Sequence, residues 1–358
     1  MQNRISRLRE LLREEEADAF LVTSPENRLY LTGFTGSSGW VVVTERETCL
    51  ITDFRYDQQA RAQSPHCRII IAGETLKDTL GELAAELNIH RLGCEGDDLT
   101  YNQFTALRDK LPGREVRPLA GTVEGLRAVK EELEIRKISA AVKLADEALK
   151  HILPYIRDGV RERDVALEIE FFMRKEGAEG ISFPLIVASG HRAAMPHGTA
   201  SDKVIRRDEL VIMDFGATLE GYNSDITRTV AVGGADKRME EIYRIVLEAQ
   251  LAGIKAIRAG IPASEADRAA RSVIEGYGYG EYFGHSTGHG LGLQIHEPPR
   301  LSAKDNTELR PGMVVTVEPG IYLPGWGGVR IEDTVVVEKN GCCVLTSSPK
   351  ERLISCGR

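Results

Sequence analysis

Two pairs of segments repeat the same pattern, and this repeat restricts the fold more than any other feature of the chain. Residues 156–177 align without a gap with residues 257–278, and residues 205–216 align without a gap with residues 309–320. In each copy the residue pattern predicts a helix end, a glycine turn, a second helix and a strand with an acid before a glycine. A period of about 100 residues is too long for a solenoid. We therefore predict two halves related by a pseudo-twofold axis.

The part of the chain before this repeat has a different pattern. With 358 residues the chain is long for a single core, so we expect two domains. Short apolar runs alternate with amphipathic stretches in residues 1–122, which predicts a small α/β domain. We expect the domain boundary between residues 122 and 123, with a second domain over 123–358. The expected strands of the first domain are 19–23, 39–44, 48–52 and 68–72, and its expected helices are 75–87 and 101–111.

A β-hairpin is predicted in the first half of the repeat. Two β-rich runs in residues 209–232 flank the turn-like stretch "LEGYN". Asp214 and Asp225 are equidistant from the predicted turn centre. In a regular antiparallel pair such residues lie opposite each other with Cβ atoms about 5 Å apart. Two like charges at that distance destabilise the sheet unless something compensates them.

The second half predicts a matching hairpin. In residues 313–337 two strand-like runs flank the glycine-rich stretch "LPGWGG". Glu318 and Glu332 are equidistant from its centre at Gly325, and Glu318 is the counterpart of Asp214 in the repeat. If the halves are related by a pseudo-twofold axis, the two pairs of acids face a common centre.

Four carboxylates around one cavity need cations to compensate their charge. Two divalent ions would cancel it, and His289 in "GHG" would add a nitrogen ligand. Oxygen-rich ligation with one imidazole favours Mn²⁺, with Co²⁺ or Zn²⁺ as alternatives. A helical zinc motif is excluded because glycines surround His289 and no Glu follows His285. The competing interpretation pairs each acid with an arginine such as Arg228 or Arg330, but two matched pairs favour metal binding.

These residues resemble the pita-bread metallopeptidases, the family of methionine aminopeptidase, prolidase and aminopeptidase P. The resemblance covers residues from about 120 to 350 and extends into "NRLYLTGFTGSSG" and "ITDFRY" of the first domain. It implies an α+β protein in which a creatinase-type α/β domain precedes a pita-bread catalytic domain. The family's five metal ligands fall on Asp214 in "MDFG", Asp225 in "NSDITR", His289 in "GHGLG", Glu318 in "VEPG" and Glu332 in "RIED".

The resemblance also implies catalytic and substrate-binding residues. Glu318 would be both a metal ligand and a proton shuttle. His197 in "MPHGTASD" and His296 in "QIHEPP" match substrate histidines of the family, and His285 and Arg330 match positions that line the same pocket. For each residue a purely structural role is the alternative.

The implied reaction is hydrolysis of the bond between an N-terminal residue and a following proline. Methionine aminopeptidases usually lack the first domain, so the length favours the proline-specific branch, and the compact first domain favours a dipeptidase over an aminopeptidase. A methionine aminopeptidase is the enzymatic alternative. A non-catalytic peptide-binding module on the same fold is the third, although such relatives characteristically lose metal acids.

Composition limits the partners and the compartment. A net charge of −8 argues against a nucleic-acid surface, and no apolar stretch is long enough to cross a membrane. The charged N-terminus lacks the apolar core of a signal peptide, and the six cysteines have no metal spacing. We therefore expect a cytoplasmic protein without nucleic-acid or membrane partners, and the family resemblance implies peptide substrates that carry proline in second position. The family resemblance adds the expectation of a homodimer.

Overall fold

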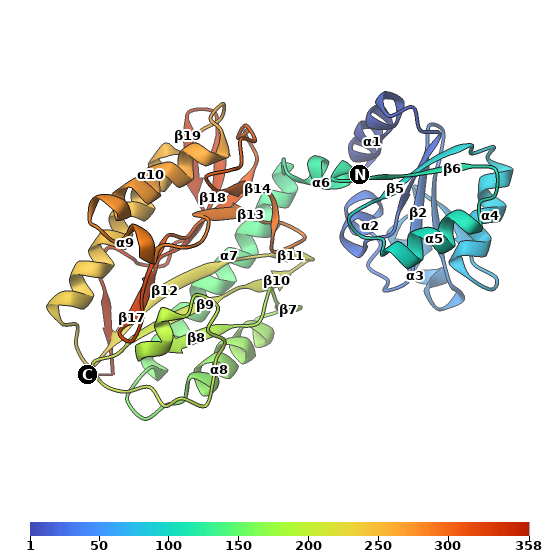
Figure 1. Ribbon diagram of the computed structural model, residues 1–358. Coiled ribbons are helices and arrows are strands. Elements are labelled where there is room, and N and C mark those ends of the chain that lie inside the picture. Colours follow the sequence, from blue (N-terminus) through green and yellow to red (C-terminus); the bar gives the residue numbers. More distant parts are fainter. Residues whose placement is uncertain (358) are drawn as a thin grey trace. The chain divides into compact units, whose positions relative to one another are not determined.

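The computed structural model describes residues 1–357 as two compact units that divide between Arg127 and Ala128. The predicted boundary lies at the start of the helix that ends the first unit. Each unit has its own sheets and its own core (Figure 1). No helix within residues 1–357 is long and apolar enough to cross a membrane.

The first unit is a six-stranded mixed sheet with the strand order β4-β3-β2-β1-β5-β6. Strand β1 is antiparallel to β2 and parallel to β5, and all four of its residues are buried because helices cover both faces of the sheet. The elements are α1 (Gln2–Glu14), β1 (Ala19–Val22), α2 (Pro25–Thr32), β2 (Trp40–Thr44), β3 (Thr48–Thr52), η1 (Phe54–Tyr56), α3 (Asp57–Gln63), β4 (Arg68–Ile71), α4 (Leu76–Glu86), β5 (Arg91–Glu95), α5 (Tyr101–Asp109), β6 (Glu115–Leu119) and α6 (Thr122–Arg127).

The predicted strands and helices of this unit are confirmed to within two residues at each end. Strands β5 and β6 were not predicted. In β6 the sequence "EVRPL" contains two charged residues, Glu115 and Arg117, and a proline, which is unfavourable within a sheet but tolerated at its edge. Its pairing with β5 depends on tertiary contacts rather than on a local pattern.

The second unit repeats one order of elements. Two helices, α7 (Glu132–Ile152) and α8 (Glu162–Lys175), precede strands β7 (Gly180–Ile181), β8 (Ile186–Ser189), β9 (Leu210–Phe215), β10 (Ala217–Leu219), β11 (Tyr222–Asn223) and β12 (Ile226–Val232), with η2 (Leu153–Tyr155) and η3 (Gly190–Ala194) between them. Two further helices, α9 (Lys237–Ala256) and α10 (Ala263–Gly276), precede η4 (Gly280–Tyr282), β13 (Gly288–Gly290), β14 (Glu297–Leu301), β15 (Val314–Val317), β16 (Gly320–Leu323), β17 (Gly327–Arg330), β18 (Asp333–Glu338), β19 (Gly341–Val344) and β20 (Ile354–Cys356).

Strand pairing confirms the predicted duplication. In the first half the order is β20-β12-β9-β8, and in the second half it is β14-β13-β15-β18-β19. The hairpin strands β9 and β12 correspond to β15 and β18, and each pair is antiparallel. Helices α7 and α8, green in Figure 1, run along the strands of the first half, whereas α9 and α10, yellow to orange, cover those of the second.

Alternation along the strands sends apolar residues to the helices and polar residues to the opposite face. On β9, Val211, Met213 and Phe215 pack into the core formed with α7 and α8, so Asp214 points away from it. On β15, Val315 and Val317 pack against residues near and on α10 in the same way. In both halves, the carboxylates and hydroxyls therefore lie on the face of the sheet that the helices do not cover.

Candidate metal centre and substrate pocket

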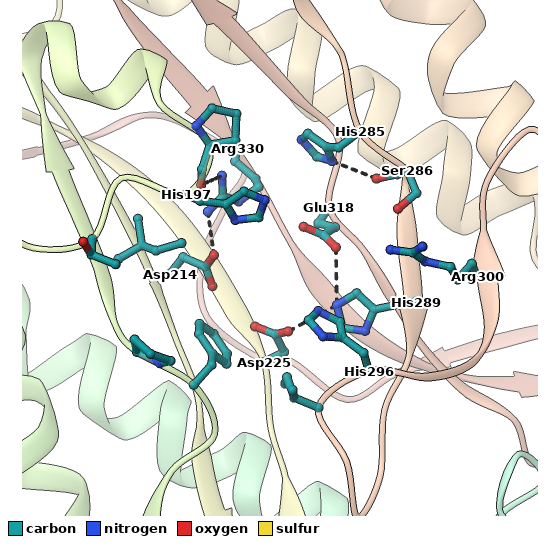
Figure 2. Close-up of a pocket in the computed structure, with 16 residues that line it drawn as sticks. His197, Asp214, Asp225, His285, Ser286, His289, His296, Arg300, Glu318 and Arg330 are labelled. Atoms are coloured by element: carbon teal, nitrogen blue, oxygen red, sulfur yellow. Dashed lines mark hydrogen bonds and ion pairs between the residues drawn. The ribbon is translucent and has the colours of Figure 1, made fainter. Parts of the chain in front are cut away.

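A pocket of about 340 Å³ opens within the second unit, and both halves of the repeat contribute to it. Figure 2 shows carboxylates and imidazoles that point into it from opposite sides. Of the nine predicted site residues, eight line this pocket, and Glu332 lies buried next to it. The lining residues are Phe183, Pro184, Ile186, Pro196, His197, Thr199, Asp214, Asp225, His285, Ser286, His289, Ile295, His296, Arg300, Glu318 and Arg330.

The register of the first hairpin differs from the prediction. Asp214 pairs with Thr227 rather than with Asp225. The turn consists of Glu220 and Gly221, both with positive φ, which is the geometry of a type I′ turn and shifts the register by two residues. Asp225 is thus diagonal to Asp214 instead of opposite it, yet both carboxylates still point into the pocket (Figure 2).

The second hairpin has the predicted register. Val317 pairs with Asp333 and Gly320 pairs with Arg330, which places Glu318 and Glu332 opposite each other between the two ladders. The ladder opens here because Glu332 donates its N–H to Thr227 O (3.1 Å) of the first hairpin. Thr227 Oγ1 in turn donates to Glu332 Oε2 (2.8 Å). The two hairpins are therefore joined where their acids meet.

His289 lies on β13 between two glycines that the packing requires. A Cβ atom at Gly288 would lie 1.9 Å from Thr316 O, and one at Gly290 would lie 2.5 Å from Pro298 O. The Nδ1–H of His289 donates to Gly290 O (3.0 Å), because a carbonyl oxygen only accepts. The remaining nitrogen, Nε2, is 3.5 Å from a carboxylate oxygen of Asp225 and 3.5 Å from one of Glu318.

The donor set fits divalent metal ions. Three buried carboxylate oxygens, Asp214 Oδ1, Asp225 Oδ1 and Glu332 Oε1, have no hydrogen-bond partner in the described chain. Ligand atoms of Asp225, His289 and Glu332 lie within 4.8 Å of one another. Such buried, unsatisfied oxygens are costly unless a cation compensates them.

The electrostatics of the cluster support the same conclusion. Burial raises the pKa of Asp225, Glu318 and Glu332 above the ordinary carboxyl range. Repulsion from neighbouring carboxylates adds to this shift. Without metal ions, protons would have to neutralise these acids. Bound divalent ions would compensate the same negative charge and leave the carboxylates ionised.

A hydrogen-bonded chain connects the cluster to His285. Arg330 donates to Asp214 Oδ2 (2.5 Å) and to the Tyr322 hydroxyl (2.8 Å). The Tyr322 hydroxyl therefore donates its own hydrogen to Nε2 of His285 (2.8 Å), while the Nδ1–H of His285 donates to Ser286 O (2.8 Å). This arrangement requires neutral His285, and burial lowers its pKa to about 4.

His197 and His296 lie on the accessible side of the pocket, where a ligand can reach them. Both are exposed residues, and the ring of His296 is 4.4 Å from that of His289 between centroids. Burial of part of its ring lowers the pKa of His296 to about 4, so it is neutral at pH 7. Both histidines predicted to contact substrate are thus open to solvent, and His296 is uncharged.

Sequence reasoning missed three polar residues of the site. Thr227 and Tyr322 are buried hydroxyl donors whose partners come from distant segments. Arg300 lines the pocket with an exposed side chain, and its position directly after the "QIHEPP" segment was the available signal. Arg228, considered as a partner for the acids, instead pairs with Asp333 (2.8 Å).

Comparisons with known proteins agree with this geometry. Residues 136–339 match the model of metallopeptidase family M24, and residues 4–129 match the creatinase/prolidase N-terminal domain. The chain is 40% identical to the Xaa-Pro dipeptidase of Pyrococcus furiosus over 355 residues, which cover 99% of this chain and 100% of the relative.

Solved structures give the same result. An Xaa-Pro dipeptidase from Bacillus anthracis is 49% identical, with a TM-score of 0.97 and coverage of 99% of both chains. An X-Pro aminopeptidase from Thermotoga maritima is 39% identical, with a TM-score of 0.90 and coverage of 96% of this chain and 99% of that one. The expected pita-bread fold with a creatinase-type first domain is confirmed, and the chain belongs to metallopeptidase family M24.

Proposed function

We propose that the protein is an Xaa-Pro dipeptidase, which hydrolyses the bond between an N-terminal residue and a C-terminal proline. The observation that carries this proposal is the cluster of buried carboxylate oxygens without partners, which adjoins a pocket lined by histidines and an arginine. Relatives named as Xaa-Pro dipeptidases, similar over nearly their whole length, support the substrate class.

Two divalent ions would be held by Asp214, Asp225, His289, Glu318 and Glu332. The oxygen-rich set with one imidazole favours Mn²⁺, with Co²⁺ or Zn²⁺ as alternatives. When bound, such ions lower the pKa of a water molecule and polarise a carbonyl group.

The side chains of the pocket would carry the proton and hold the substrate. Glu318 would accept a proton from water at its carboxylate and pass it to the leaving nitrogen of proline. That nitrogen needs the proton because an unprotonated amide anion is a poor leaving group. His197 and His296 would donate hydrogen bonds to the carbonyl oxygen as negative charge develops on it.

Arg300 supports a preference for dipeptides. In a dipeptide the proline carboxylate lies directly beyond the scissile bond, and a guanidinium binds a carboxylate with two parallel hydrogen bonds. Arg300 supplies a guanidinium at the pocket, and the apolar residues Phe183, Pro184 and Ile295 offer a surface for the proline ring. An aminopeptidase acting on longer peptides would have no terminal carboxylate at this place.

The test is a substrate panel on the protein loaded with Mn²⁺. We expect rapid cleavage of Ala-Pro and much weaker cleavage of its C-terminal amide and of Ala-Pro-Ala-Ala. Arg300→Ala should raise KM for Ala-Pro while leaving the amide unaffected, and Arg300→Lys should recover part of the loss.

Other results would select an alternative. Equal rates on Ala-Pro and Ala-Pro-Ala-Ala would favour an aminopeptidase, and cleavage of Met-Ala-Ser without cleavage of proline peptides would favour a methionine aminopeptidase. No turnover with Mn²⁺, Co²⁺ or Zn²⁺ would favour a peptide-binding module.

The family resemblance leads us to propose a homodimer, which sedimentation velocity would test. We also propose a cytoplasmic location. All six cysteines are free thiols, and a reducing compartment keeps thiols in that state.

A further inference from the structure

The loop between β13 and β14 connects the proposed ligand His289 to His296. The two strands are antiparallel, with Gly290 opposite Glu297, so the chain reverses direction within residues 291–296. Asn223 of the first hairpin holds the top of this loop, since its N–H donates to Gly292 O (2.8 Å) and its Nδ2 to Leu293 O (2.9 Å). These contacts fix the start of the loop but not its end, where His296 lies.

A buried ion pair fixes the other end. Glu297 follows His296 directly, and its Oε2 accepts a hydrogen bond from Lys130 Nζ at 2.9 Å. The side chains of Lys130 and Glu297 are only 1% and 2% exposed. The other carboxylate oxygen of Glu297 accepts the N–H of Gln294 (3.0 Å), which closes the loop on itself.

The surroundings are shaped to accept this carboxylate. A Cβ atom at Gly292 would lie 2.7 Å from Glu297 Oε2, so any other residue there would displace it. The backbone of Lys130 is held as well, because its N–H donates to Gly312 O (2.9 Å). Lys130 is therefore a fixed anchor, and the ion pair ties Glu297 to it.

Stability alone does not account for such a pair. The desolvation of two buried charges offsets most of their attraction, and apolar residues of similar size would stabilise the fold as well. What the pair adds is a defined position for the backbone at Glu297 and hence for His296. The imidazole of His296 needs that definition because it stands on the open side of the pocket.

We infer that Lys130 and Glu297 are positioning residues that hold His296 against His289 at the substrate pocket. The inference rests on the proposed function for its kinetic consequence. A displacement of about 1 Å in a group that contacts the reacting carbonyl can lower the rate about 100-fold. Loss of the pair should therefore reduce kcat and leave KM and metal binding unchanged.

The experiment compares Lys130→Met with Lys137→Met, a matched control on α7. Lys137 pairs with Glu220, whose side chain is 64% exposed, so its loss should leave kcat unchanged. We expect Lys130→Met to lower kcat for Ala-Pro about 10- to 100-fold. In a His296→Ala background the same substitution should have no further effect, because its effect passes through His296. A wild-type kcat, or a drop that multiplies fully with that of His296→Ala, would overturn the inference.

Two additions keep the test decisive. If Lys130→Met does not fold, Glu297→Gln and the apolar pair Lys130→Met/Glu297→Leu replace it with the same expectation. If the wild-type protein does not cleave proline peptides, the proposed function fails, but the NMR signal of the His296 Cε1–H still tests the positioning. That signal should shift in Lys130→Met and not in Lys137→Met, and an unchanged signal would overturn the inference.

Discussion

Removal of metal should make the stability of the protein fall as the pH rises. Burial, reinforced by mutual repulsion, raises the pKa of Asp225, Glu318 and Glu332 above the ordinary carboxyl values near 4. Between those ordinary values and the raised ones, the folded metal-free chain binds more protons than the unfolded chain. The free energy of unfolding then decreases with pH, by about 1.4 kcal/mol per pH unit for each retained proton.

The magnitude can be worked out for the interval from pH 7 to 8. His285 and His296, whose pKa values burial lowers to about 4, make the opposite contribution, but only up to the ordinary histidine pKa near 6.5. Above pH 7, each net proton that the carboxylate cluster retains over this interval gives a loss of about 1.4 kcal/mol per pH unit. For a domain of this size that corresponds to a decrease in Tm of roughly 3–6 °C.

The assay is thermal unfolding by circular dichroism at pH 7 and pH 8, with chelator and with Mn²⁺. The metal-loaded protein shares every other titrating group, so the difference between the two Tm values isolates the cluster. We expect this difference to grow with pH, and to grow less in Asp225→Asn, which has one charge fewer. A metal-free Tm that is constant or higher at pH 8 would show that the carboxylate cluster retains no proton above pH 7, and would refute the reasoning.

Three substitutions test individual roles in the pocket. Glu318→Gln should lower kcat by at least about 100-fold, because the amide cannot accept the proton, and steady-state kinetics with metal analysis would check this. His296→Ala should leave metal content at the wild-type level and lower kcat about 100-fold; an effect on KM alone would contradict the proposed oxyanion contact. Tyr322→Phe removes the hydroxyl between Arg330 and His285. It should lower kcat/KM with metal retained, and an unchanged kcat/KM would show that the hydrogen-bonded chain does not orient either residue.

The sequence predicted the duplication because it repeats in the local pattern of helices, turns and strands. It also placed Glu318 opposite Glu332, since the glycine-rich turn lies at the centre of that hairpin. The first hairpin was wrong by two residues because the turn was placed one residue too early. The type I′ turn at Glu220 and Gly221 depends on two positive φ values that "LEGYN" does not reveal.

The polar contacts around the ligands were beyond local patterns. Thr227 binds Glu332 from 105 residues away, and Lys130 binds Glu297 from 167 residues away. Periodicity and spacing do not reveal the partner of the Thr227 hydroxyl or of the Lys130 ammonium group, because those partners are set by how the two halves pack. The proposed ligands could be located from the sequence because each lies within a hairpin or a glycine-flanked strand.

Anomalous diffraction from crystals of the protein grown with Mn²⁺ would test the central claim most directly. We predict two manganese peaks, each within bonding distance of carboxylate oxygens, surrounded by Asp214, Asp225, His289, Glu318 and Glu332. Crystals without a peak at these side chains, or with manganese bound only elsewhere, would contradict the account.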